Sequence, residues 1–391
     1  MVCEPEGRPL AKTDSTNEEG IGRRIREARK FMGLRQADLS DMTGLPASHL
    51  SDIERQVLTP TIPTLRTISQ ALNRPLEYFL QEDTGGPRSM GTVIHATSIA
   101  GQAAARFGQL VEQKTEGEVR LRMYHRAALG TAHEQLQGLA EGAIHLYVDE
   151  PLSFELYADL CGPVFLPYFF RDREHYHRFL GSSIFEEHIY QRLLDNGIRI
   201  LNPASNWECG SFELLFSTEP IFSPADLVGR KMRSYASEAA VALRQALGAE
   251  PVVVEWERIY EAFEGGLIDT LLVPAAYFES IEMHKLAKQA TFLSYGYTVN
   301  TTVAVSERAY RNLSPAVQRV LTEAIEETGA YCTQLANKQT LIHLQNLSEE
   351  YGVPVIHPSQ GTWRTTFEAA IRQICEEGLL APDLYEELQS L

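Results

Sequence analysis

The sequence holds few residues whose types and spacing suggest covalent chemistry. It contains no nucleophile paired with a base, no P-loop, and no Gly-x-Gly-x-x-Gly run that leads into a helix. Its five cysteines are scattered without a Cys-x-x-Cys pair, which predicts neither a disulfide framework nor a metal site. We therefore expect no enzyme activity, no metal ion and no cofactor.

Some charged side chains are suited to binding a small ligand. Arg233 lies at the end of a predicted strand, where its planar guanidinium can hold a carboxylate through two parallel hydrogen bonds. Asp149 and Glu150 follow another predicted strand and could reach an amine or a cation. Charged residues at strand ends are equally well explained by exposure to solvent. The residues alone leave both interpretations open.

The elements that would position these side chains form two similar β-α-β-α-β patterns. The first has strands over 93–97, 119–124 and 144–148 and helices over 102–116 and 132–141. The second has strands near Met232 and over 251–254 and 267–273, with helices over 237–247 and 257–263. This predicts two α/β lobes, with a ligand between them at the carboxyl ends of strands and the amino ends of helices.

A long helix is predicted after the second pattern. Ser314 suits a helix N-cap and Pro315 the first helical position. Apart from Gly329, no glycine or proline interrupts the chain until Gly352. About 37 residues would span roughly 55 Å. Because one lobe does not need that length, we expect the helix to cross both lobes.

The N-terminal part has a different pattern. Residues 21–80 contain four short segments with apolar residues at helical spacing, and Gly44 followed by Pro46 and Ser48 separates two of them. Segments 35–43 and 46–55 therefore predict a helix-turn-helix. Residues 1–20 are polar and acidic and predict a disordered tail. Residues 81–90 combine Gly, Pro and charge and predict a linker, which leaves 91–391 for the two lobes.

Charge is distributed unevenly between these parts. The chain has 35 basic and 52 acidic residues, a net charge of −17, which taken alone argues against a nucleic acid or an anionic membrane as a partner. Residues 21–80, however, hold nine basic and six acidic residues, a net +3, whereas residues 91–391 carry −16. A locally basic helical module fits DNA binding, and the acidic remainder should discourage non-specific DNA binding.

The N-terminal module resembles the DNA-binding domain of Cro and the phage repressors (XRE type). Three strings and Pro60 carry the resemblance: Ile25-Arg-Glu-Ala-Arg29, Gly33-Leu-Arg-Gln36-Ala-Asp-Leu39 and Leu50-Ser-Asp-Ile53-Glu54-Arg55. It implies that the second helix of the motif enters the major groove. Ala47, Ser48 and Asp52 would face bases, and Arg29 with Glu54 would form an internal ion pair.

The same resemblance places Gln36 and His49 near phosphates, with Arg35 also on the DNA-binding side. Arg35 replaces the small hydroxyl residue usual in this family, and Gln56 replaces the usual glycine. Ala47 and Asp52 cannot make the strong bidentate base contacts of long amide or arginine side chains, so the operator sequence is not predicted. The alternative is a helical bundle with a solvated basic face.

Residues 91–391 resemble the dicarboxylate-type solute-binding proteins of TRAP transporters. The resemblance rests on these strings, together with the long helix after Leu313-Ser314: Glu112-Gln-Lys-Thr-Glu-Gly117, Leu129-Gly130, Gly142-Ala-Ile144, Phe165-Leu-Pro-Tyr-Phe-Phe-Arg-Asp172, Phe222-Ser-Pro-Ala-Asp-Leu-Val-Gly229, Lys231-Met-Arg233, Leu247-Gly-Ala249, Tyr260 and Gly266-Leu-Ile-Asp269. It implies an α/β, two-lobe, periplasmic-binding-protein-like domain of type II with a lobe-spanning helix, here following an all-α helix-turn-helix domain.

The resemblance also implies a ligand site centred on Arg233, the position of the family's carboxylate-binding arginine. Phe212 stands where the family has a second arginine, and Val273 where it has an asparagine before proline. Because a buried polar group of a ligand needs a partner, these replacements predict a monocarboxylate with an apolar or aromatic body. Tyr168, Trp256 and Tyr277 would assist Phe212 in holding that body, although core packing explains each aromatic equally well.

The combination predicts a ligand-responsive transcriptional regulator. A homodimer or higher homo-oligomer would bind palindromic operator DNA, and a small carboxylate would alter that binding. The first residues lack an apolar signal segment and no run reaches the roughly 18 apolar residues of a membrane span, so we expect a cytoplasmic protein without a membrane partner. The alternatives are a TRAP solute-binding protein with a vestigial or dimerising N-terminal module, and an enzyme.

Overall fold

The computed structural model describes residues 20–74, 76–80, 88–92, 94–210, 212–275, 277–294 and 300–391. The predicted tail, apart from Gly20, and positions 81–87 of the predicted linker lie outside the described residues. The chain divides into two compact units, residues 1–60 with 64–82 and residues 61–63 with 83–391. None of the helices in the described ranges has both the length and the apolar composition to cross a membrane.

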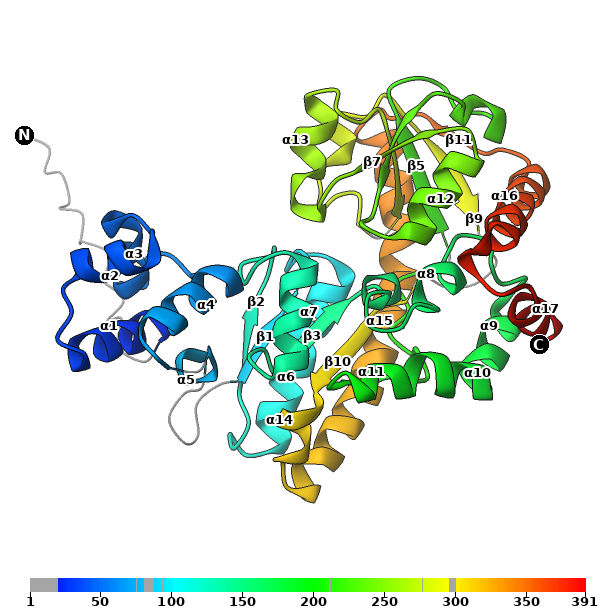
Figure 1. The fold of residues 1–391 in the computed structure, drawn as a ribbon. Coiled ribbons are helices and arrows are strands. Elements are labelled where there is room, and N and C mark those ends of the chain that lie inside the picture. The colour runs from blue at the N-terminus through cyan, green and yellow to red at the C-terminus, as the bar shows by residue number, and fades with distance from the viewer. Residues whose placement is uncertain are drawn as a thin grey trace, which may run out of the picture. The chain divides into compact units, whose positions relative to one another are not determined.

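The smaller unit is helical (Figure 1). Its helices are α1 (Ile21–Phe31), α2 (Gln36–Thr43), α3 (Ala47–Glu54), α4 (Ile62–Ala71) and α5 (Leu76–Leu80). Leucines and isoleucines at helical spacing are fully buried between them, including Ile25, Leu39, Leu50 and Ile53. Gly44 ends α2 in the left-handed conformation with φ 70°, as a helix end before a tight turn favours. The predicted helix-turn-helix is therefore present, and α5 is an additional short helix.

The first lobe of the larger unit is built on a five-stranded sheet. The strand order is β2 (Leu121–Tyr124), β1 (Arg88–Gly91), β3 (Leu146–Asp149), β10 (Thr302–Ser306) and β4 (Ile198–Ile200). β1 runs parallel to β2 and β3, whereas β10 is antiparallel to β3 and β4. Helices α6 (Ile99–Lys114) and α7 (Ala132–Glu141) pack on this sheet. Between β3 and β4 lie α8 (Cys161–Val164), α9 (Arg173–Leu180), α10 (Ser183–Phe185) and α11 (Gln191–Asp195).

The second lobe is built on a six-stranded sheet. The order is β11 (Val355–Ile356), β9 (Gln289–Ser294), β5 (Phe212–Ser217), β8 (Thr270–Pro274), β6 (Lys231–Ser234) and β7 (Glu250–Val253). β6 is parallel to β7 and β8, and β5 is antiparallel to β8 and β9. Helix α12 (Glu238–Ala246) packs against β6 and β7, and α13 (Ile259–Glu264) precedes β8. The chain ends with α16 (Gln360–Ile374) and α17 (Pro382–Ser390).

Helix α15 (Pro315–Glu349) joins the two lobes (Figure 1). It has 35 residues, and the Ser314 hydroxyl caps it by accepting a hydrogen bond from the Val317 amide. Its first half packs along α6 in the first lobe. Near its end, His343 reaches Glu279 of the second lobe at 3.3 Å. The predicted long helix that crosses both lobes is confirmed.

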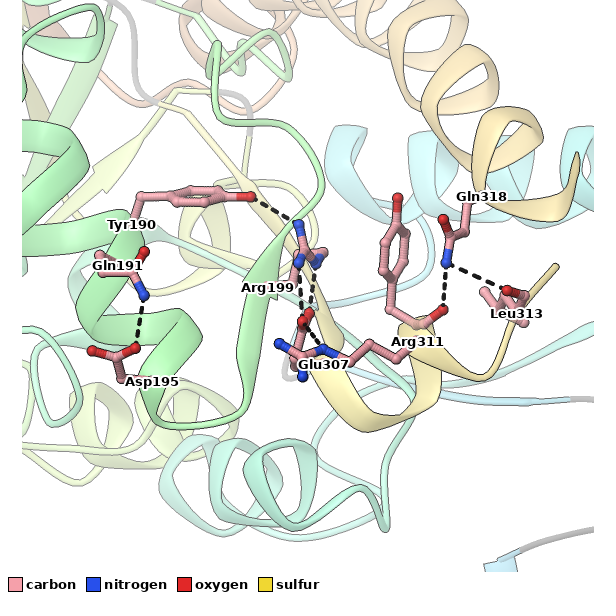
Figure 2. A network of polar contacts seen from close by, with 9 residues as sticks. Tyr190, Gln191, Asp195, Arg199, Glu307, Arg311, Leu313 and Gln318 are labelled. Atoms are coloured by element: carbon pink, nitrogen blue, oxygen red, sulfur yellow. Dashed lines mark hydrogen bonds and ion pairs between the residues drawn. The ribbon is translucent and has the colours of Figure 1, made fainter. Parts of the chain in front are cut away.

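A polar network holds the chain that leads into this helix against the first lobe. Figure 2 shows Arg199 of β4 paired with Glu307, the first residue of α14 (Glu307–Arg311), at 2.6 and 3.0 Å. Arg311 contacts the same carboxylate at 2.6 Å. Burial opposes ionisation of Glu307, but the hydrogen bonds from the two arginines keep its pKa below the usual value. The chain therefore leaves β10 in a defined direction before α15 begins.

The predicted elements agree with most of the structure, with one clear error. The strand expected over 93–97 is wrong, because β1 occupies Arg88–Gly91 and the described residues 94–97 form no strand. β1 therefore begins inside the predicted linker 81–90. Its polar Arg88 and Ser89 give a weak strand signal, and pairing with β2 and β3 on both sides overrides local propensity.

Candidate ligand-binding cleft and DNA-binding helix

A cavity of about 470 Å³ lies between the two lobes of the larger unit. From the first lobe its walls include Asp149 at the end of β3 and Ala132 at the start of α7. From the second lobe they include Arg233 of β6 and Ser237, the N-cap of α12. The position at strand ends and helix starts is the one predicted from the repeated pattern. Its volume falls within the roughly 300–1,000 Å³ typical of small-molecule sites.

Arg233 lines this cavity and uses only part of its hydrogen-bonding capacity within the chain. Its side chain is 3% exposed, and its Nε donates to the Val254 carbonyl at 3.1 Å. The guanidinium carbon lies 3.9 Å from the centre of the Tyr235 ring and 5.8 Å from that of Trp256. Nη1 is buried and has no hydrogen-bond partner among the residues that the structure describes. A buried guanidinium nitrogen without a partner is costly, so the site is suited to an anionic acceptor from outside the chain.

Two acidic residues face Arg233 from the first lobe. Asp149 accepts hydrogen bonds from the hydroxyls of Tyr147 and Ser153 at 2.6 and 2.8 Å. The next residue, Glu150, accepts one from the Tyr235 hydroxyl at 3.0 Å. Burial raises the pKa of Asp149, and burial together with the Asp149 charge raises the pKa of Glu150 to about 7. These are enclosed groups of the cleft and not the solvent-exposed acids that the sequence left as an alternative.

A second, smaller cavity of about 70 Å³ adjoins the first. The two share Glu150, Leu152 and Tyr235 in their walls. Arg244 of α12 also lines the smaller cavity, and its Nε donates to the Arg233 carbonyl at 2.7 Å. Tyr235 thus lies close to both arginines and connects the two spaces.

Three of the six predicted ligand residues line the larger cavity. These are Arg233, Trp256 and Tyr277. The ring centres of Trp256 and Tyr277 lie 6.0 Å apart with the rings nearly perpendicular. The Tyr277 hydroxyl donates to the Cys209 thiol at 3.3 Å, so it is engaged with the chain segment that links β4 to β5. Its ring, and not its hydroxyl, is the part suited to contact a ligand.

The other three predicted residues are not brought to either cavity. Phe212 packs on Phe292, with ring centres 4.8 Å apart, and Val273 is fully buried in the core. Their chain neighbours Glu213 and Leu272 line the smaller cavity instead. Because successive side chains of a strand point to opposite faces, the neighbour of each predicted residue lines the cavity, and a ligand contact at Phe212 or Val273 stays a prediction.

Tyr168 also lies elsewhere. It is buried against Phe367 of α16, with ring centres 5.2 Å apart, and it lines a separate space next to α17. It is therefore a packing residue of the C-terminal helices, which was the alternative that the sequence left open for any single aromatic residue.

In the helical unit, the expected ion pair between Arg29 and Glu54 is present. Arg29 Nη2 donates to Glu54 at 2.7 Å, its Nε donates to the other carboxylate oxygen, and its Nη1 donates to the Leu34 carbonyl at 2.7 Å. Both side chains are buried, and the hydrogen bond to Glu54 raises the pKa of Arg29. The Gln36 amide also donates to Glu54, at 2.8 Å. One of its two amide hydrogens is thereby withdrawn from the predicted phosphate contact.

The predicted base-facing residues lie on α3. Ala47 and Ser48 occupy its first turn and are exposed, whereas His49 is half-buried. Asp52 pairs with Arg55 at 2.6 Å, which neutralises a charge that DNA would repel. Arg35 precedes α2 and pairs with Asp38 at 2.8 Å, so it is part of a helix cap as well as an exposed cation.

The sequence did not single out Tyr235, Glu255 or Arg244 as parts of the site. Tyr235 directly follows β6, and Glu255 lies two residues after the end of β7, which runs parallel to β6. Residues at the ends of adjacent parallel strands meet at one edge of a sheet, and this rule could have identified them. Among the described residues, no group of three or more His, Cys, Asp or Glu side chains is arranged to hold a metal ion.

Comparison with known proteins gives two family matches. Residues 90–378 match the family described as bacterial extracellular solute-binding protein, family 7, and residues 25–79 match a helix-turn-helix family. Relatives include the 2,3-diketo-L-gulonate-binding periplasmic protein YiaO of Escherichia coli (strain K12), 26% identical over 65% of this chain and 76% of the relative. The C4-dicarboxylate-binding periplasmic protein DctP of Rhodobacter capsulatus is 27% identical over 73% of this chain and 84% of that protein.

Solved structures share the two-lobe fold. A TRAP periplasmic solute binding protein from Sulfurospirillum deleyianum DSM 6946, with bound succinate, superposes with a TM-score of 0.69 at 20% identity and covers 78% of this chain and 99% of that one. Another from Fusobacterium, with bound sn-glycerol-3-phosphate, gives 0.70 at 18% identity, covering 78% and 96%. The predicted fusion of a helix-turn-helix domain with a TRAP-type receptor fold is confirmed.

Proposed function

The chain belongs to family 7 of the bacterial extracellular solute-binding proteins and joins this fold to a helix-turn-helix domain, and we propose that it is a ligand-responsive transcriptional regulator. One observation carries the proposal: a chain with a DNA-binding fold also encloses a cavity lined by a buried arginine, Arg233, whose Nη1 has no hydrogen-bond partner among the described residues. On a chain with a DNA-binding fold, a ligand-binding cleft would allow the bound ligand to control DNA binding. The relatives named above bind solutes, and we propose that this chain has no catalytic activity.

The DNA-binding part would act through α3. Its first turn exposes small side chains at Ala47 and Ser48, so the backbone can approach the floor of the major groove closely. Proteins of this architecture bind as dimers to two half-sites, which makes a palindromic operator the expected target. Operator binding also places the protein in the cytoplasm.

The effector would be a small carboxylate bound to Arg233. Apolar side chains make up much of the remaining wall, among them Leu136, Leu152, Val254 and Trp256. A second carboxylate on the ligand would need a second cation facing the same cavity, and among the described lining residues Arg233 is the one arginine or lysine. We therefore propose a monocarboxylate with an apolar body as the effector.

Ligand binding would act on the segments that cross between the lobes. One crossing segment runs from β4 to β5. In it, Trp207 donates to the Ile325 carbonyl of α15 at 3.2 Å, and Cys209 contacts Tyr277 of the cavity wall. A β-bridge between Glu208 and Asn300 pairs this segment with the one that returns from β9 to β10. A ligand that contacts both lobes favours a closed arrangement by its differential affinity for that state. Closure would then change how two DNA-binding units in a dimer are presented.

DNA binding can be measured with a labelled duplex from the region upstream of the protein's own gene, by fluorescence anisotropy at several salt concentrations. Ser48→Glu places a negative charge in the first turn of α3 and should weaken binding more than tenfold. Gln70→Glu adds the same charge at an exposed position of α4 and is the matched control, with an expected change below threefold. Equal effects of the two variants would contradict the role of α3.

The sensing role requires a second measurement on the same duplex. Carboxylates that raise the unfolding temperature should change the DNA affinity of the wild type, and Arg233→Ala should remove this response while leaving ligand-free DNA affinity intact. A protein that binds carboxylates without binding any duplex, from this region or from a genomic selection, would instead be a solute-binding protein whose N-terminal module serves another purpose. Turnover of a bound acid would support an enzyme.

A further inference from the structure

The walls of the larger cavity carry more negative than positive charge. The described acidic residues that line it are Asp149, Glu150, Glu155, Asp159, Glu238 and Glu255, against the single arginine Arg233. This excess is unexpected for a site that binds only an anion, because like charges in a partly enclosed space repel strongly. Arg233 does not neutralise the excess by pairing, since no ion pair joins it to any of these carboxylates among the described residues.

Several of these acids have evident partners in the chain. Glu155 accepts from the Ala239 amide at 3.5 Å, and Asp159 pairs with Arg192 at 3.2 Å. Asp149 accepts three hydrogen bonds, from Tyr147, Ser153 and the Glu150 amide. These contacts account for three of the six carboxylates without any ligand.

Glu150 and Glu255 have fewer evident partners, and among the described residues neither forms an ion pair with an arginine or a lysine. Glu150 accepts one hydrogen bond, from the Tyr235 hydroxyl, and Glu255 follows Val254, whose carbonyl accepts from Arg233. Both side chains are half-buried in the cavity wall, and burial raises the pKa of each. Arg233 is therefore linked to the neighbourhood of both carboxylates: it stacks on Tyr235, which donates to Glu150, and it donates to Val254, which precedes Glu255.

We propose that the effector is a zwitterion, whose carboxylate binds Arg233 and whose positively charged nitrogen binds beside Glu150, with Glu255 in support. The inference rests on the proposed carboxylate-binding role of Arg233 and specifies the ligand further. Nη1 of Arg233, which has no partner among the described residues, indicates that the ligand supplies a hydrogen-bond acceptor. The two carboxylates indicate that the ligand also supplies a hydrogen-bond donor. A single molecule that carries both charges satisfies all three groups.

The apolar and aromatic walls fit the rest of such a molecule. The cavity that holds the charged groups is also lined by Trp256, Tyr277, Leu136 and Leu152. Trp256 and Tyr277 also offer ring surfaces to a cation, which they attract through their quadrupoles. An amino acid with an aliphatic or aromatic side chain, or a similar amino carboxylate, has this combination. Succinate lacks the cation and adds a second negative charge next to the acids.

Matched ligands test the proposal with the full-length protein by calorimetric titration. L-leucine is compared with 4-methylpentanoate, and L-phenylalanine with 3-phenylpropanoate, which differ only in the amino group; succinate is the dianion. We expect at least one amino acid to bind ten or more times tighter than its partner without nitrogen. Glu150→Gln should reduce amino-acid affinity to that of the partner and leave the affinity of the partner within twofold.

The control variant is Asp159→Asn, which removes a charge from the same cavity at a side chain that is 77% exposed and already paired with Arg192. It should change amino-acid affinity less than threefold, and a loss equal to that of Glu150→Gln would contradict a specific nitrogen site. Equal or tighter binding of the acids without nitrogen overturns the zwitterion and leaves the carboxylate receptor standing. If no carboxylate of either class binds, both the inference and the proposed function are contradicted.

Discussion

Two buried arginines in this chain have opposite surroundings. Arg29 in the helical unit donates to both oxygens of Glu54 and to the Leu34 carbonyl. Arg233 in the cleft donates to one backbone carbonyl and stacks on Tyr235, and its Nη1 has no partner in the described part of the chain. Burial alone therefore does not separate an arginine that is satisfied within the chain from one that is suited to a ligand. The difference lies in how many of the donors the chain itself satisfies.

Removing the satisfied arginine should have the largest effect. Arg29→Ala leaves the Glu54 carboxylate buried without its cation, which should destabilise the helical unit by about 3–5 kcal/mol. Urea denaturation followed by circular dichroism measures this, and DNA binding should be lost with the fold. The double variant Arg29→Met with Glu54→Leu removes both charges and should recover most of the stability. A loss below 1 kcal/mol for the single variant would show that the pair is not structural.

Removing the unsatisfied arginine should act mainly on ligand binding. Arg233→Ala should weaken binding of the effector carboxylate by about 30-fold or more, equivalent to roughly 2 kcal/mol for a charged hydrogen bond. Its cost in stability should be well below that of Arg29→Ala, because few protein groups lose a partner. Thermal unfolding and titration of the same samples separate the two effects. An affinity that stays within twofold would rule out Arg233 as the carboxylate site.

A pH series sharpens the contrast, since the cleft contains a carboxyl that titrates near neutrality. Burial and Asp149 raise the pKa of Glu150 to about 7, while Tyr235 and Arg233 oppose this shift. A cationic nitrogen binds the ionised form, so Glu150 must lose its proton below pH 7. Amino-acid affinity should therefore rise up to about tenfold from pH 6 to pH 8. Calorimetry in two buffers should detect proton release, and Glu150→Gln should give a flat profile.

The smallest effect concerns backbone strain in the helical unit. Gln56 adopts a left-handed conformation with φ 61°, at the position where the resemblance to the phage repressors implies glycine. Gln56→Gly should stabilise the unit by about 1 kcal/mol, because glycine adopts this conformation without steric cost. The same replacement at Gln70, in the right-handed helix α4, should destabilise it. If both replacements stabilised the unit, or both destabilised it, the assignment of backbone strain to Gln56 would be contradicted.

The sequence predicted helices better than strand faces, for a physical reason. Ser314 with Pro315 and the glycine at 44 mark helix ends through local backbone chemistry, and these predictions were confirmed. Phe212 and Val273 were placed in the cleft by resemblance, yet their neighbours Glu213 and Leu272 line its smaller cavity. Successive side chains of a strand point to opposite faces of the sheet. A prediction that is displaced by one residue therefore selects a core side chain in place of one that faces the cleft.

The candidate ligand site could be predicted only in part from the sequence. Arg233 was identified by its match to a family position, and Asp149 with Glu150 by their place after a strand. Tyr235 and Glu255 acquire their meaning from the pairing of β6 with β7 and from the approach of the first lobe. Contacts between residues 85 positions apart, such as Tyr235 with Glu150, leave no local pattern in the chain.

Helix α15 also determines how the receptor unfolds. One continuous hydrophobic core contains Phe107 of the first lobe, Phe216 of the second, and Leu321 and Leu347 of this helix. Loss of structure in either lobe would expose the face of α15 that packs in the shared core, so we expect the two lobes to unfold as a single cooperative unit. A calorimetric scan should show one transition for the whole receptor, and a proteolytic cut within α15 should destabilise both lobes together.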